Sequence, residues 1–143
     1  MNELLYLLIL QSRLWSAISS MCVGFHIWAL FLETVLIVDD EAATRDILVE
    51  LLHKDGREIV TAGDGREALE RLAEISRPCL IVLDLIMPRM NGFEFLHQQS
   101  TDSSIANIPT IVLSGSTRPA GARHQLSKPV DVNRLLALID QYC

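Results

Sequence analysis

The chain has few basic residues and no closely spaced cysteines. Twelve Lys and Arg stand against eighteen Asp and Glu, a net charge of -6, and ten of the twelve are scattered Arg. This charge has the wrong sign for binding a phosphate backbone, so nucleic acid is not expected as a direct partner. Cys22, Cys79 and Cys143 form no CxxC pair, which argues against a zinc site. We expect all three to stay reduced, as in a cytoplasmic protein.

Residues 1–33 differ in kind from the rest of the chain. Residues 14–32 carry no charge and residues 4–10 are almost wholly aliphatic, so length alone would allow a membrane span. Ser, Gly and His dilute the segment, and its nearby basic residue, Arg13, lies on the N-terminal side. That charge would place the remainder outside the cell. We expect a non-structural extension or a misassigned start; the alternatives are a membrane or docking helix over residues 4–32 and a helix packed on the domain.

From residue 34 onward, apolar runs alternate with amphipathic segments. The pattern predicts strands over 34–39, 58–62, 79–84, 110–113 and, more weakly, 125–127. It predicts helices over 43–54, 67–75, 93–99 and 132–142, the first with Ile47, Leu48, Leu51 and Leu52 on its apolar face. Such alternation is typical of an α/β fold with a doubly wound parallel sheet, here a single domain over residues 34–143.

Polar residues end three of these strands. Asp39 and Asp40 follow the first strand, Asp84 ends the third and Ser114 follows the fourth. Because ligands bind at the carboxyl ends of strands in open α/β sheets, we expect these side chains to form one site. Crowded carboxylates favour Mg²⁺, and Lys128, after the last strand, adds a positive charge. This set of groups suits phosphoryl transfer to an Asp nucleophile.

Four segments then carry a family resemblance. They are Val38-Asp39-Asp40-Glu41, the run from Asp84 to Gly92, Leu113-Ser114-Gly115, and Ser127-Lys128-Pro129. Together, in this order and each at a strand end, they resemble the receiver domain of two-component response regulators. The resemblance covers residues 34–143 and implies a flavodoxin-like fold with five parallel strands in the order 2-1-3-4-5.

The resemblance also implies a chemistry for the strand-end residues. Asp84 would be the phosphoacceptor, taking its phosphoryl group from a histidine kinase or a histidine phosphotransfer protein. Ser114 and Lys128 would contact that group, and Pro129 is commonly cis in this family. The implied Mg²⁺ site consists of Asp40, Asp84 and the backbone carbonyl of Ile86 as direct ligands, with Asp39 acting mainly through a bound water. The protein would be a cytoplasmic signalling phosphoprotein acting through an unknown downstream protein, and would catalyse only its own phosphorylation and dephosphorylation.

Two departures from the family pattern concern the output of the signal. Ser114 and Lys128 are fourteen positions apart, so we expect a loop or a single turn in place of the fourth helix. Gln125 stands where the family has an aromatic switch residue. With no effector domain after residue 143, we expect a stand-alone receiver; the alternative is a docking module whose phosphorylation switching has decayed. A phosphatase of the haloacid dehalogenase type is disfavoured, because Ile86 occupies the position of its catalytic acid.

Simpler roles suffice for several other residues. Asp39 or Asp40 could cap the following helix, and turn and cap chemistry is sufficient for Asp64. We expect Met87 and Met90 to pack their loop against the core. The four histidines show no ligand spacing and receive no predicted role.

Overall fold

A parallel sheet of five strands forms the centre of the unit Glu33–Cys143 in the computed structural model. The structure describes residues 33–53, 56–115 and 119–143. The strands are β1 (Thr34–Val38), β2 (Glu58–Ala62), β3 (Leu80–Asp84), β4 (Thr110–Ser114) and β5 (His124–Ser127). Their order is β2-β1-β3-β4-β5 and every pairing is parallel, which confirms the predicted fold.

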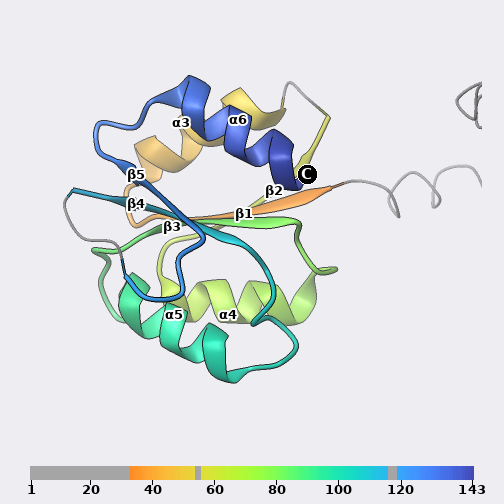
Figure 1. Cartoon of the computed structure of the whole chain (residues 1–143), viewed down its shortest axis with the longest axis vertical. Helices are drawn as coiled ribbons and strands as arrows, with labels where there is room; N and C mark the ends of the chain where they lie inside the picture. Colours follow the sequence, from red (N-terminus) through yellow and green to blue (C-terminus); the bar gives the residue numbers. More distant parts are fainter. Residues whose placement is uncertain (1–32, 54–55, 116–118) are drawn as a thin grey trace, which may run out of the picture. The chain divides into compact units, whose positions relative to one another are not determined.

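Helices cover both faces of the sheet. They are α3 (Ala42–His53), α4 (Gly65–Glu74), α5 (Gly92–Thr101) and α6 (Val132–Tyr142). Helices α3 and α6 lie over one face, and α4 and α5 lie over the other (Figure 1). No helix in the described part of the chain is long and apolar enough to cross a membrane. The predicted hydrophobic extension lies outside the described residues.

The two helix layers explain the composition of the strands. Every residue of β1, β3 and β4 is buried, because helices, and loop residues on one side of β4, cover both sides of these strands. Leu36 and Val38 of β1 pack on the α4 and α5 side, whereas Val35 and Ile37 pack on the α3 and α6 side. Each fully buried Leu or Ile stabilises the fold by about 1.5–3 kcal/mol relative to an exposed one.

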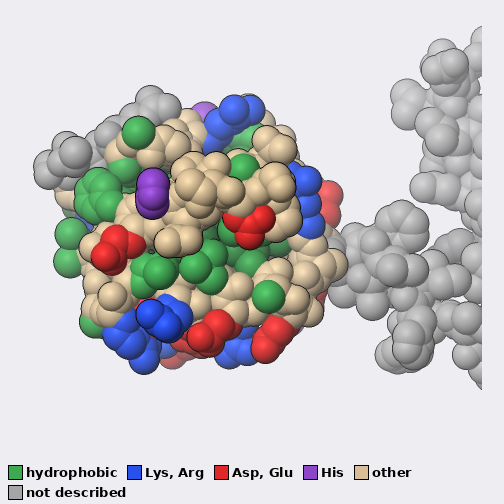
Figure 2. Space-filling model, turned by 90° about the horizontal axis from the view of Figure 1, so that it is seen from below, with side chains coloured by type: hydrophobic (Ala, Val, Ile, Leu, Met, Phe, Trp, Pro, Cys, Tyr) green, Lys and Arg blue, Asp and Glu red, His purple; other side chains and the backbone are tan. Residues whose placement is uncertain are grey.

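The connection between β4 and β5 lacks the fourth helix, as predicted, over its described residues 115 and 119–123. Val112 of β4 is nevertheless fully buried, because it packs in a cluster with Ile105, Ile108 and Ala122. Figure 2 shows this side of the molecule, with hydrophobic side chains through its middle and charged ones around them. Loop residues here cover the sheet in place of a helix.

A buried glutamine holds the loop between α5 and β4, which contains Ile105 and Ile108. The Gln99 amide donates to the carbonyl oxygens of Ile105 (3.2 Å) and Ile108 (2.9 Å). Its oxygen accepts a hydrogen bond from the hydroxyl of Thr110, at 3.1 Å. The side chain is only 4% exposed, so these bonds satisfy polar groups that water does not reach. The sequence pattern gave no sign of this network.

The helix boundaries and one helix face differ from the sequence prediction. Helix α4 begins at Gly65, two residues earlier than expected, because the Asp64 side chain caps it through the backbone N–H groups of Arg66 and Glu67. In α3, Leu48 and Leu52 are buried as predicted, but Ile47 is 59% exposed. Neighbouring helical residues point about 100° apart, so Ile47 faces outward when Leu48 faces the sheet.

The prediction of reduced cysteines is wrong for two of the three. Cys79, just before β3, and Cys143, just after α6, form a disulfide bond. Their Cα atoms lie 5.5 Å apart, although the residues are separated by 64 positions. The fold brings the start of a strand beside the end of a helix, which the spacing of cysteines along the chain does not reveal. Cys22 lies outside the described residues.

Candidate functional site

Three carboxylates meet at the carboxyl edge of the sheet. Strands β1 and β3 are neighbours, with Val38 paired to Leu83, so the residues that follow in each strand adjoin. One oxygen atom from each of Asp39, Asp40 and Asp84 lies within 4.8 Å of the others. Asp39 and Asp84 are buried, and Asp40 is exposed. The predicted strand-end acidic residues therefore form one cluster with a solvent-facing side.

Asp39 is the least satisfied member of this cluster. Its Oδ1 atom accepts a hydrogen bond from the Glu41 N–H at 2.8 Å, just before α3 begins. Its Oδ2 atom is buried without a hydrogen-bond partner among the described residues. Burial raises the pKa of Asp39, and the charges of Asp84 and Asp40 add to the increase; the Glu41 N–H and Lys128 act in the opposite direction.

This arrangement fits a hard divalent cation. A buried carboxylate oxygen with no donor is costly, and like charges within one cluster repel each other. Carboxylate oxygens in such a cluster are the ligands that Mg²⁺ prefers. A capping role alone does not account for Asp39: the Glu41 N–H uses only Oδ1, and Oδ2 accepts no hydrogen bond from the described residues.

Lys128 reaches the cluster from β5. Its Nζ atom lies 3.2 Å from Oδ2 of Asp84 and 3.8 Å from Oδ2 of Asp39. The Lys128 N–H donates to the backbone oxygen of Ser114 at 3.2 Å, which holds the residue after β5 beside the end of β4. The Lys128–Pro129 peptide bond is cis, as the resemblance implied. The ammonium partly balances the carboxylates, and the Lys128 side chain is 41% exposed.

Ser114 ends β4, the strand next to Asp84. The register pairs Leu113 with Asp84, and the Ser114 side chain is buried at the same edge. Gln125 lies farther back in β5, paired with Val112 and half-buried. The structure thus brings Asp39, Asp40, Asp84, Lys128 and Ser114 to one edge of the sheet.

The loop after Asp84 is folded tightly against the site. A Cβ atom on Gly92 would lie 2.5 Å from the backbone oxygen of Asp84, so a glycine is required there. The Gly92 N–H donates to the Leu85 oxygen at 3.0 Å. Met87 is buried and Met90 packs on the same core cluster, which confirms their predicted packing role. Ile86 instead projects outward, 77% exposed, two residues past Asp84.

A second buried aspartate braces this loop. Asp64 is 1% exposed and forms an ion pair with Arg89, whose backbone adopts a positive φ of 63°. The Gly65 N–H donates to the Met90 oxygen at 3.0 Å, and a Cβ on Gly65 would clash with Met90 at 2.7 Å. Burial favours a higher pKa for Asp64, but the Glu67 and Arg66 N–H groups and the Arg89 guanidinium lower it overall.

Sequence reasoning missed three of these contacts. Arg45 of α3 donates to the backbone oxygen of Asp39, at 2.5 Å, and so ties α3 to the site. The Arg89 contact was not predicted, although Asp64 was expected to cap α4. His124 has a structural partner, the Tyr142 hydroxyl at 2.7 Å, where no role was assigned. Each of these contacts depends on how separate elements pack together, so no local sequence pattern predicts it.

Residues 35–140 match the family model of the response regulator receiver domain, and the chain belongs to this family. It is 32% identical over 114 residues to protein PilH of Pseudomonas aeruginosa, covering 74% of this chain and 93% of PilH. It is 39% identical over 115 residues to the transcriptional regulatory protein PdtaR of Mycobacterium tuberculosis, covering 74% of this chain and 54% of PdtaR.

Solved structures agree with this assignment. The chemotaxis response regulator CheY4 of Vibrio cholerae superposes with a TM-score of 0.69 at 33% identity, covering 78% of this chain and 99% of CheY4. A response regulator receiver protein from Pseudomonas putida gives a TM-score of 0.71 at 30% identity, covering 77% of this chain and 97% of that chain. The protein is therefore a receiver domain of two-component signalling.

Proposed function

We propose that Asp84 accepts a phosphoryl group from a phosphohistidine on a histidine kinase or a histidine phosphotransfer protein. One observation carries the proposal: Lys128 Nζ lies 3.2 Å from Asp84 Oδ2, beside the Oδ2 atom of Asp39, which accepts no hydrogen bond from the described residues. A nucleophilic carboxylate, a cation and an unsatisfied anionic oxygen at one solvent-facing edge suit transfer of a phosphoryl group.

The transfer conserves atoms and charge as follows. An Asp84 carboxylate oxygen forms a bond to phosphorus, the phosphorus–nitrogen bond breaks, and the imidazole leaves with the electron pair and takes a proton. Lys128 exchanges its contact with Asp84 for one with a phosphoryl oxygen. The Ser114 hydroxyl, at the end of the neighbouring strand, donates a hydrogen bond to another phosphoryl oxygen.

Asp39, Asp40, Asp84 and the backbone carbonyl of Ile86 would hold Mg²⁺, which supplies neutralisation of the phosphoryl oxygens. Signalling then proceeds through a partner protein, in the cytoplasm, where we also expect the phosphohistidine donor to lie. Ile86, two residues past Asp84, places a bulky apolar side chain on the exposed surface of this loop. We expect it to hinder an attacking water and so to give a long-lived aspartyl phosphate.

The test uses the full chain with Mg²⁺ and acetyl phosphate, followed by intact mass. We expect the wild type to gain one phosphoryl group, Asp84→Asn to gain none, and chelation of Mg²⁺ to abolish the gain. Asp64→Asn is the matched control: it alters a buried aspartate outside the cluster while keeping a good helix cap, and should be phosphorylated normally. Mg²⁺ binding without any mass gain would favour the docking-module alternative.

A further inference from the structure

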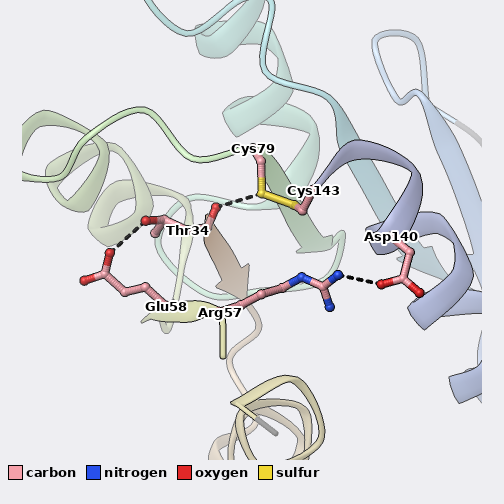
Figure 3. The surroundings of a disulfide bond; sticks show 6 residues. All are labelled: Thr34, Arg57, Glu58, Cys79, Asp140 and Cys143. Carbon is pink, nitrogen blue, oxygen red and sulfur yellow. Dashed lines mark hydrogen bonds and ion pairs between the residues drawn. A yellow bond between two sulfur atoms is a disulfide. The ribbon is translucent and has the colours of Figure 1, made fainter. Parts of the chain in front are cut away.

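The disulfide lies at the amino edge of the sheet, at the other end of β3 from Asp84. Cys79 directly precedes β3 and Cys143 directly follows α6. Figure 3 shows the bond joining the two elements, with the Arg57–Asp140 ion pair reaching α6 from another side. The bond therefore connects the end of a surface helix to the strand that carries the proposed phosphoacceptor.

The body of α6 is anchored without this bond. Leu135 and Ile139 are no more than 1% exposed and pack in the core cluster beneath α3 and α6. The end of α6 makes smaller contacts: the Arg57–Asp140 pair at 2.5 Å, the His124–Tyr142 hydrogen bond at 2.7 Å, and the packing of the half-buried Tyr142 against the edge of the same cluster. Asp140 is 61% exposed, so water screens its pair. Opening the disulfide would leave the helix docked through Leu135 and Ile139 and loosen the part of the last turn that follows Ile139.

The reduced state has a hydrogen-bond acceptor already in place. The Sγ atom of Cys79 lies 3.2 Å from the backbone oxygen of Thr34. A disulfide sulfur has no hydrogen to donate, but a thiol does, so reduction would create this bond without moving the strand. Both cysteines are half-buried and so partly open to solvent. The surroundings of Cys79 and Cys143 therefore accommodate both the disulfide and the two thiols.

We propose that Cys79 and Cys143 form a reversible redox site that clamps the last turn of α6 when oxidised and frees it when reduced. The expectation of reversibility rests on the proposed function, which places the protein with its phosphodonor in the cytoplasm. Disulfides in that compartment are usually transient and redox-sensing. The clamp acts at the opposite edge of the sheet from Asp84, so redox state and phosphorylation are separate inputs.

The redox step balances with a protein dithiol as the reductant. A thiolate of the dithiol attacks one sulfur of the Cys79–Cys143 bond, which breaks, and the departing thiolate takes a proton. The second thiol of the reductant then attacks the mixed disulfide. The products are two cysteine thiols on this chain and the oxidised, disulfide form of the reductant.

The test uses the full chain carrying Cys22→Ser, which prevents exchange with the third cysteine. Thiol alkylation with and without dithiothreitol is read by intact mass, and hydrogen exchange is followed in a peptide containing residues 139–143. Labelling times are kept too short for exchange in β3. We expect no alkylation before reduction and two alkylated thiols after it, with exchange in the last turn rising by about tenfold or more.

Two variants in the same background serve as controls. Cys79→Ser and, independently, Cys143→Ser should match the reduced protein and no longer respond to dithiothreitol. In a glutathione redox buffer, the parent protein should reach the same oxidised fraction from either direction. Alkylation without reductant, unchanged exchange on reduction, or unfolding of the whole domain on reduction would each overturn the proposal. Acetyl phosphate labelling of both redox forms is scored separately, so failure of the phosphoacceptor would not be mistaken for failure of the clamp.

Discussion

Two aspartates of this domain are equally buried but differ in how their charge is satisfied. Asp39 follows β1 and Asp64 lies two residues after the neighbouring strand β2, and each is 1% exposed. Asp64 has backbone donors and the Arg89 guanidinium, and its pKa is lowered. Asp39 has an oxygen that accepts no hydrogen bond from the described residues, two carboxylate neighbours and the Lys128 ammonium at 3.8 Å, and burial raises its pKa. Burial alone therefore does not distinguish a structural carboxylate from a ligand-binding one; the supply of donors does.

The largest stability change should come from removing the satisfied carboxylate. Asp64→Ala deletes the cap of α4 and the partner of Arg89, so we expect a loss of about 1–2 kcal/mol in the free energy of unfolding. Denaturant titration measures the loss. Asp64→Asn, which keeps the cap, should lose distinctly less, and equal losses would show that the ion pair rather than the cap stabilises the loop.

A substitution at Asp39 should instead increase the free energy of unfolding. Asp39→Asn removes a buried negative charge from a crowded cluster, so without Mg²⁺ the protein should gain on the order of 1 kcal/mol at neutral pH. The same variant should lose the stabilisation that millimolar Mg²⁺ gives the wild type. Thermal melts with Mg²⁺ and with chelator measure both effects. A destabilised variant in chelator would contradict the view that Asp39 is unsatisfied.

The stability of the protein should depend on pH in opposite directions for Asp39 and Asp64. Because the pKa of Asp39 is raised, its destabilising effect applies at neutral pH and disappears as pH falls toward the ordinary value of 3.8. Because the pKa of Asp64 is lowered, its stabilising effect is complete above 3.8 and is lost as pH falls below that value. In chelator, Asp39→Asn should remove the first trend and Asp64→Asn the second. Denaturant midpoints measured across this range provide the check.

The smallest effect is expected at Arg89. Its side chain is 68% exposed, so its pair with Asp64 is screened and Arg89→Ala should cost less than about 1 kcal/mol. Chemical denaturation at low and high salt measures it, and the difference between wild type and variant should shrink as salt rises. A cost of several kcal/mol that does not change with salt would contradict the description of this contact as a screened ion pair.

Sequence reasoning reached the fold and the residues of the candidate site because both follow from local patterns. Continuous apolar runs mark buried parallel strands, and the polar residue after each run lies at the carboxyl edge of the sheet. Asp39, Asp84 and Ser114 were found in this way, without any knowledge of contacts. The absence of the fourth helix was predicted by comparing the short segment before Lys128 with the receiver family that the chain resembles.

Contacts between the ends of elements were beyond such patterns. The Cys79–Cys143 bond, the Gln99 hydrogen bonds and the Asp64–Arg89 pair depend on where each element stops relative to its neighbours. The exposure of Ile47 shows the same limit, because a one-residue rotation of a helix face changes which residue is buried. The periodicity of apolar residues predicts which face of a helix is apolar, whereas packing determines which residues at the edge of that face are buried.

The most direct measurement locates the phosphoryl group itself. Borohydride reduces an aspartyl phosphate to homoserine, so peptide sequencing of the full chain after treatment with acetyl phosphate and Mg²⁺ identifies the modified position. We expect homoserine at position 84 alone, with Asp39, Asp40 and Asp64 unchanged. Homoserine at any other aspartate, or none in protein that demonstrably binds Mg²⁺, would contradict the assignment of Asp84 as the phosphoacceptor.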